Sequence, residues 1–294
     1  MNHQWPTYAK LLLTALFWGG TFTAGKIVSE RIGPFSISFL RFVIASLFLL
    51  FITWKIEGKL PRLKGRQIVP ILLLGMTGIF IYNVCFFKGL QMIEAGRASL
   101  IIATSPVFIA VFSSWLFRER LNLIRISGIV ISVMGAIIVI SKGKLLGVFQ
   151  GTLGWGELCI FCCVLCWVAY SLIGKTVMDG LSPIASVAYS SVVGAVALSI
   201  PACYEGIVQN ITGYWAIDWL SIFYLSIFGT VIGFVWYYQA VKHIGPTRAG
   251  LFINFVPIFA IAIAFVMLEE VITLSLFAGT VLVIAGVYLT NKTS

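Results

Sequence analysis

The stretch RASLIIATSPVF at residues 97–108 returns later in the chain as RAGLFINFVPIF at residues 248–259. The two copies lie 151 residues apart, and the same spacing aligns further positions after them. The matched pairs are Arg97 with Arg248, Ala98 with Ala249, Leu100 with Leu251, Pro106 with Pro257, Phe108 with Phe259, Glu119 with Glu270, Gly128 with Gly279, and Gly135 with Gly286. This order of matches indicates that one structural unit occurs twice.

The beginning of the chain shows the same duplication at a spacing of 149 residues. Here Trp18 aligns with Trp167, Gly25-Lys26 with Gly174-Lys175, and Pro34 with Pro183. The change of spacing requires only a two-residue slip in one loop. The sequence therefore predicts two similar units, residues 1–146 and residues 147–294.

The composition indicates that lipid is the solvent for much of this chain. Of its 294 residues, 60% are hydrophobic and 10% are charged, and the mean hydropathy is +1.04. A soluble domain carries about 25% charged residues. The apolar runs are also too long for barrel strands, which have about ten alternating residues. We expect an all-α integral membrane protein.

Ten apolar runs are long enough to be membrane-spanning helices, which need roughly 20 residues each. They cover residues 8–28, 35–54, 68–88, 97–117, 124–141, 155–175, 183–204, 219–241, 248–268 and 274–291. Each unit then holds an odd number of spans, so the second unit must enter the membrane from the opposite face. Inverted repeats of this kind are common in secondary transporters, which bind substrate in a central cavity between the halves.

The basic residues predict that both termini are cytoplasmic, because short cytoplasmic loops are enriched in Lys and Arg. That orientation places on the cytoplasmic side Lys10, Lys55, Lys59, Arg62, Lys64, Arg66, Arg118, Arg120, Arg125, Lys175, Lys242, Arg248 and Lys292. The opposite side holds only Lys26, Arg31, Lys88, Arg97, Lys142 and Lys144. The net charge of +10 is thereby explained without a nucleic-acid partner. The polar N-terminus lacks a signal-peptide cleavage pattern, so we expect the first span to be retained.

Several short motifs resemble the EamA-type transporters of the drug/metabolite transporter superfamily across the whole chain. They are Phe17-Trp18-Gly19-Gly20, Leu40-Arg41-Phe42, Ala98 through Pro106-Val107, Glu119-Arg120-Leu121, and Pro257-Ile258 with Glu269-Glu270. The resemblance implies ten helices around a cavity lined by the first four of each half. It also implies transport of small molecules such as amino acids, quaternary amines, nucleotide sugars or drugs, with export the more common use.

Two charged residues are candidates for substrate or proton chemistry. Arg41 lies about 10 Å into the second span, counting 1.5 Å per residue from Pro34, where an ionised side chain costs about 2.5–3.5 kcal/mol. It is either an anchor for a carboxylate or phosphate, or a structural or snorkelling residue; its counterpart is Ser190. Glu157 opens the sixth span, where it either stabilises the helix N-terminus, couples protons, or balances an amine substrate.

Aromatic and amide side chains deep in the spans are the other candidates for substrate binding. They are Trp18, Trp167, Tyr82, Asn83, Tyr170, Trp236, Tyr237 and Asn254. Aromatic residues of the membrane interface belong at span ends, whereas Trp18, Trp167 and Trp236 do not lie there. Ring faces attract cations as well as apolar groups, and amides in hydrocarbon need partners or water. Ordinary helix packing is the alternative explanation for each of them.

Two pairs of equivalent residues are candidates for gating. Lys26 and Lys175 close the first and sixth spans, where they either gate opposite faces or snorkel to headgroups. Pro106 and Pro257 lie within equivalent spans, where proline bends a helix; the bends are either moving hinges or static kinks.

The remaining motifs carry no predicted chemistry. Cys159, Cys162, Cys163 and Cys166 spell CxxCCxxC, but one straight helix cannot wrap four thiolates around a metal, so we interpret them as packing residues. Small residues in the fifth and tenth spans favour close contact between these helices or a homodimer. Catalytic motifs and cofactor sites are missing. We expect a secondary transporter, a bacterial inner-membrane amino-acid exporter by our first hypothesis; the alternatives are a non-transporting sensor or scaffold, or an importer of quaternary amines or nucleotide-type metabolites.

Overall fold

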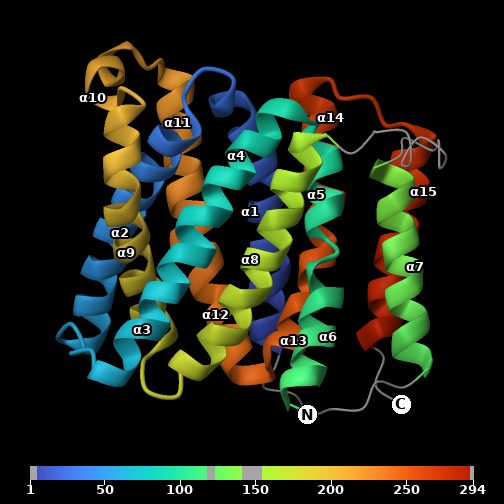
Figure 1. The fold of residues 1–294 in the computed structure, drawn as a ribbon, viewed down its shortest axis with the longest axis horizontal. Coiled ribbons are helices and arrows are strands. Elements are labelled where there is room, and N and C mark those ends of the chain that lie inside the picture. Colours follow the sequence, from blue (N-terminus) through green and yellow to red (C-terminus); the bar gives the residue numbers. More distant parts are fainter. Residues whose placement is uncertain (1–4, 118–122, 141–153, 292–294) are drawn as a thin grey trace.

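The computed structural model describes residues 5–117, 123–140 and 154–291, and these form a bundle of helices (Figure 1). In the first half the helices are α1 (Trp5–Ser29), α2 (Pro34–Glu57), α3 (Gly65–Leu74), the π-helix η1 (Gly75–Ile81), α4 (Tyr82–Met92), α5 (Ala95–Ile102), α6 (Ser105–Phe117) and α7 (Leu123–Ile140). Within the described ranges there is no β-strand.

The second half repeats this order of elements. It comprises α8 (Trp155–Val177), α9 (Pro183–Tyr204), the short α10 (Ile207–Asn210) and η3 (Ile211–Gly213), α11 (Ala216–Tyr224), the π-helix η4 (Leu225–Ile232), α12 (Gly233–Ile244), α13 (Pro246–Gly250), the 3₁₀-helix η5 (Leu251–Phe255), α14 (Val256–Leu268) and α15 (Leu274–Asn291). The helix bounds agree with the predicted spans to within a few residues.

Eight helical segments in the described residues are long and apolar enough to cross a membrane, and two shorter apolar helices accompany them. The shorter stretches, Ile126–Gly135 and Leu274–Gly286, lie in α7 and α15. The predicted class, a multi-pass α-helical membrane protein, is confirmed. Many large apolar side chains on the outside, such as Leu47, Phe51 and Val266, are exposed as lipid contact requires.

The two halves are inverted relative to each other. In Figure 1, α1 starts at the end of the bundle where α15 finishes, whereas its counterpart α8 starts at the opposite end. The first helix of each half packs on helices of the other half. Helix α1 packs on α11, α12 and α14 of the second half, while α8 packs on α3, α4 and α6 of the first half. Counterparts α2 and α9 pack on each other, as do α7 and α15. We call the end where α1 begins and α15 finishes the terminal end, and the other the distal end.

Both halves break their helices at the same places. The third helix of each half contains a π-helical stretch, η1 or η4, and π-helical turns free backbone carbonyls from the regular ladder. The fourth is interrupted just before its proline: by a turn at Ala103–Thr104, and by η5 in the second half. Pro106 and Pro257 thus stand in the first turn of a new helix, where a missing N–H costs nothing, instead of bending a continuous helix.

The small residues of the last helix in each half serve contact within the chain. A Cβ added at Gly135 would lie 2.8 Å from the backbone nitrogen of Val283, and one at Gly286 would lie 2.3 Å from that of Ser132. The backbones of α7 and α15 therefore touch, which only glycine allows here. This pair stands beside the other helices in Figure 1 and contributes nothing to the cavity described below.

Candidate functional site

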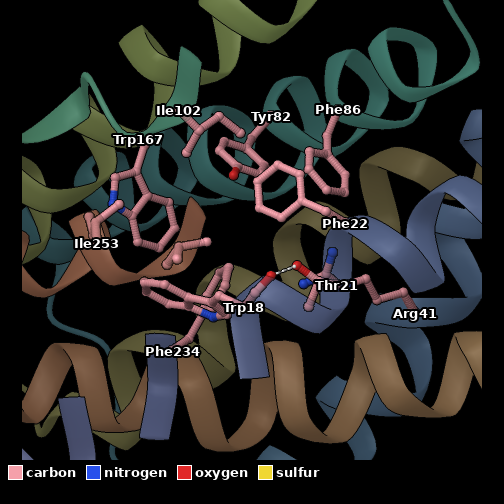
Figure 2. A pocket seen from close by; sticks show the side chains of 11 residues that line it. Trp18, Thr21, Phe22, Arg41, Tyr82, Phe86, Ile102, Trp167, Phe234 and Ile253 are labelled. Carbon is pink, nitrogen blue, oxygen red and sulfur yellow. Dashed lines mark hydrogen bonds between the residues drawn. The ribbon is translucent and has the colours of Figure 1, made fainter. Parts of the chain in front are cut away.

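A cavity of about 40 Å³ lies between the two halves at mid-bundle (Figure 2). Its walls come from α1, α2, α4 and α5 in the first half and from α8, α12, η5 and α14 in the second. The lining residues are Trp18, Thr21, Phe22, Arg41, Tyr82, Phe86, Ile102, Trp167, Phe234, Ile253 and Val256. Aromatic rings make up most of this surface, and Arg41 is the one ionisable cation among its lining residues.

The two tryptophans place this cavity on the pseudo-twofold axis. Trp18 and Trp167 are counterparts in the repeat, and their rings meet edge to face with centroids 5.2 Å apart. Counterparts touch only where the axis passes between them. The Trp18 indole donates a hydrogen bond of 2.9 Å to the carbonyl of Gly229, in η4, so its orientation depends on the π-helical stretch. Tyr82 completes the group, with its ring 5.7 Å from that of Trp167.

Arg41 is buried, with 4% of its surface exposed, and both π-helical regions hold its guanidinium. Its Nε donates to Oγ1 of Thr230, in η4, at 3.0 Å. Its Nη1 donates to Oδ1 of Asn83, in the first turn of α4 after η1, at 2.9 Å. The Asn83 amide in turn donates to the carbonyl of Ile79 at 2.8 Å. These partners are neutral, and in the described part of the chain no carboxylate lies within ion-pair distance of Arg41.

The close approach of Arg41 to η4 depends on glycine. A Cβ added at Gly229 would stand 3.1 Å from Nη2 of Arg41 and 2.8 Å from a methyl group of Thr21. Gly78 occupies the equivalent place in η1, where a Cβ would stand 2.1 Å from the Tyr170 ring. The neutral hydrogen-bond partners of Arg41, and the glycine that admits its guanidinium, therefore lie in or next to the π-helical stretches.

The other predicted aromatic and amide residues surround the cavity without lining it. Tyr170 and Tyr237 are fully buried behind Trp167, and their hydroxyls pair with Ser190 at 3.2 Å and Ser171 at 3.0 Å. Ser190, the counterpart of Arg41, is thus a hydrogen-bond partner of Tyr170. Trp236 faces Phe17, with ring centroids 6.2 Å apart.

Asn254 lies in η5 beside the cavity-lining Ile253. It is buried, and its Oδ1 accepts no hydrogen bond from the described residues. A buried acceptor in this condition is costly, and Asn254 is therefore a candidate contact for a polar group that enters the cavity.

Glu157 and the two lysines lie away from the cavity. Glu157 accepts a hydrogen bond of 3.1 Å from the backbone of Gly154, at the start of α8, and pairs with Arg97 at 2.8 Å. Both the helix-capping role and an ion pair are thus observed at the distal end. Lys26 donates to the carbonyls of Leu90 and Ile93 at the same end, whereas Lys175 is exposed at the terminal end.

The described residues include no cluster of three or more His, Cys, Asp or Glu side chains that could hold a metal ion. The thiol of Cys163, from the CxxCCxxC motif, is buried and donates to the carbonyl of Tyr82 at 3.3 Å. Sequence reasoning did not identify several cavity residues: Thr21, Phe22, Phe86, Ile102, Phe234, Ile253 and Val256. Most are ordinary apolar residues that carry no sequence signal, but Gly78 and Gly229 are counterparts and could have indicated the close approach.

Comparison with known proteins agrees with this architecture. The EamA-like transporter family matches residues 5–141 and again residues 154–292. The chain belongs to the EamA-like transporter family. The two matched segments coincide with the two halves of the bundle, one match to each inverted unit.

Three relatives illustrate the range of this family. A Bacillus subtilis protein named uncharacterized transporter YyaM is 28% identical, with 95% of this chain and 92% of that protein covered. An uncharacterized transporter of Archaeoglobus fulgidus is 29% identical over 95% of this chain and 96% of its own. A probable terminal-alkyne amino-acid exporter of Streptantibioticus cattleyicolor is 28% identical over 96% of this chain and 92% of its own. These relatives agree on transport and on full-length similarity.

A solved crystal structure shares the fold. It superposes with a TM-score of 0.69 at 19% sequence identity, covering 98% of this chain and 97% of the other. At this identity the likeness concerns the arrangement of helices alone.

Proposed function

We propose that this family member is a secondary transporter that exports amino acids or related small metabolites across the bacterial inner membrane. The observation that carries the proposal is the mid-bundle cavity at the contact of two inverted halves, where a buried arginine stands among aromatic rings. The amino-acid exporter among the relatives supports the substrate class. Two inverted units are the usual basis of alternating access.

In this proposal Trp18, Arg41, Tyr82 and Trp167 contact the substrate directly, because they line the cavity. Asn83 acts through Arg41, which it holds. Ten helices cross the membrane, five in residues 1–146 and five in residues 147–294, with both termini in the cytoplasm. The basic terminal end then faces the cytoplasm and the distal end the outside.

The cavity must enlarge for transport to occur. Its volume of about 40 Å³ is far below the ~300–1,000 Å³ of typical ligand pockets, so a substrate of this class does not fit in the cavity at its present size. The helix interruptions at Ala103–Thr104 and at η5 adjoin this centre. We assign them as the places where α5 and α14 move when one end opens.

Flux in proteoliposomes tests the proposal. Purified protein should move radiolabelled apolar or aromatic amino acids across the liposome membrane, and the variant Trp167→Ala should depress this flux while the protein is still recovered in full yield. Binding of a ligand without any flux would favour the alternative class, a membrane sensor or scaffold. Flux of quaternary amines or nucleotide-type metabolites in preference to amino acids would refute the substrate class.

A further inference from the structure

The cavity is electrostatically one-sided. Arg41 places one positive charge on its wall, and none of its lining residues is acidic. The guanidinium is always ionised, and its Nη2 donates no hydrogen bond to the described residues. A buried charge without a counter-charge is costly, so the site favours a ligand that supplies the negative charge.

From this we infer that the substrate must carry a carboxylate on a flat apolar or aromatic body, and that amines without an anionic group are rejected. The carboxylate accepts hydrogen bonds from Arg41, a geometry for which guanidinium is well suited. The body packs against the rings of Trp18, Trp167 and Phe234, which line the cavity, once the cavity has enlarged. This inference rests on the proposed function, because it specifies the ligand of the same cavity.

A matched set of ligands tests the charge preference. Titration calorimetry of detergent-purified protein at pH 7 compares 3-phenylpropionate, phenylalanine and 2-phenylethylamine, which share one ring and differ in charge. We expect the carboxylate to bind at least about tenfold more tightly than the amine. Arg41→Gln should remove this preference and Arg41→Lys should retain part of it, with thermal unfolding confirming that both variants fold.

Tighter binding of the amine, no binding of the carboxylate, or an unchanged preference in Arg41→Gln would overturn the inference. Failure of the proposed function looks different: flux is then missing for every compound, whatever its charge.

A separate observation concerns the two ends of the bundle. At the distal end, Arg31 pairs with Asp218 at 3.4 Å, and Arg31 also lies over the Trp215 ring at 3.6 Å from its centroid. Asp218 is 1% exposed. Its partner Arg31 is 33% exposed. The second pair at this end, between Arg97 and Glu157, is largely buried on both sides.

The terminal end lacks the counterpart of the Arg31–Asp218 pair. By the repeat spacings, Gly180 is the counterpart of Arg31 and Gln67 is the counterpart of Asp218. The structure supports this equivalence, because Asp218 accepts from the backbone of Trp215 at 2.8 Å and Gln67 accepts from that of Lys64 at 2.9 Å. A Cβ at Gly180 would lie 2.7 Å from the Gln67 amide. The two counterpart residues are therefore also in contact, but neither of them is charged.

A hollow of about 340 Å³ marks this place at the terminal end. It is lined by Arg66, Gln67, Pro70, Thr176, Val177, Asp179 and Gly180. By contrast, each end has a glutamate that contacts the start of a helix of the other half: Glu205 accepts from the backbone of Ser36 at the start of α2, and Glu57 accepts from the hydroxyl of Ser182 at the start of α9.

Two identical inverted halves would make the inward-open and outward-open states equal in energy. Opening the distal end must separate both ion pairs, in which Asp218, Arg97 and Glu157 are buried while Arg31 is 33% exposed. Separation therefore leaves buried charges without partners. Opening the terminal end separates Gln67 from Gly180, and neither of these residues carries a charge. The geometry points to a transporter whose resting state opens at the terminal end, with the Arg31–Asp218 pair as the distal lock; this also rests on the proposed function.

The lock is tested by removing the Arg31–Asp218 pair from the distal end and, separately, by introducing the same pair at the terminal end. The cavity-lining Thr21 is replaced by Cys in a chain without its native cysteines, and a membrane-impermeant maleimide is added from one side or the other of oriented vesicles. We expect labelling to be at least about tenfold faster from the terminal side. Arg31→Gly with Asp218→Gln should accelerate labelling from the distal side, and Gly180→Arg with Gln67→Asp should slow it from the terminal side.

The control is Glu205→Gln compared with Glu57→Gln, which weakens one glutamate contact at each end and should change the two labelling rates in opposite directions. Equal rates from both sides, faster distal labelling, or no response to moving the pair would overturn the lock. Flux is measured separately with the unsubstituted protein, because Thr21 lines the cavity. A protein that transports but labels equally refutes only the lock, whereas one without any flux refutes the proposed function.

Discussion

Removal of the Asn83 side chain should loosen the centre of the molecule. Asn83 is fully buried and accepts the Nη1 hydrogen bond of Arg41 at 2.9 Å. In Asn83→Leu, a similar volume remains but this acceptor disappears, leaving Thr230 as the acceptor from Arg41. A hydrogen bond to a charged group contributes about 1.5–3 kcal/mol, so we expect a loss of about 2 kcal/mol in the free energy of unfolding.

The assay is reversible unfolding in mixed detergent micelles, combined in a double-mutant cycle with Arg41→Met. The cycle isolates the pair, because residues in one hydrogen-bond network are not additive. We expect a coupling energy of about 1–3 kcal/mol. Thr230→Val, which removes the other acceptor, should show a similar coupling with Arg41→Met.

Additive effects, within about 0.5 kcal/mol, would refute the reasoning that the two π-helical regions are joined through Arg41. Substrate affinity provides a second measurement. Because Asn83 orients the guanidinium, Asn83→Leu should weaken binding of a carboxylate while leaving binding of a neutral aromatic compound unchanged.

Three further predictions follow from packing and exposure. Gly286→Leu forces a side chain into the backbone of α7, 2.3 Å from its nearest atom, and should abolish membrane yield, whereas Gly213→Ala, with open space around it, should not; equal yields on immunoblots would contradict this. Glu157→Gln breaks a buried ion pair and should lower the free energy of unfolding by about 3–5 kcal/mol, while a flux that loses its dependence on a pH gradient without loss of stability would instead identify a proton carrier. In folded protein a maleimide should label the exposed Cys203 within minutes and the buried Cys163 only after denaturation; rapid labelling of Cys163, read by mass spectrometry, would show that α8 does not pack on α4 as described.

Hydropathy predicted the helices well, because lipid requires long apolar runs whose ends are marked by charge, proline or glycine. The π-helical stretches η1 and η4 were not predicted. In these stretches the α-helical hydrogen-bond spacing changes to the π-helical spacing, while the residues remain as apolar as those around them. Hydropathy therefore does not reveal the change. Pro106 and Pro257 were predicted to bend their spans, but the helix is interrupted just before each of them, since a new helix accepts proline in its first turn.

Candidate residues in the cavity were predictable where their chemistry is unusual for a membrane span. Arg41, Trp18, Tyr82 and Trp167 line the cavity and were all candidates. Glu157 was a candidate on the same reasoning, yet it pairs with Arg97 outside the cavity. A charge in a span signals that it needs a partner, but the sequence does not say whether that partner is a protein residue or a ligand.

The amino-acid sequence by itself predicted that the helices lie in lipid, that the chain contains two repeats and that these are inverted. Hydropathy, length and the odd number of spans in each half depend only on the order of residues. Tertiary structure alone decided which side chains meet across the two halves. Trp18 and Trp167 touch, and Arg41 is held by Asn83 and Thr230, only because helices far apart in the chain pack at the pseudo-twofold axis. Contacts across that axis depend on helix rotation and on local π-helical geometry, and neither leaves a periodic pattern in the sequence.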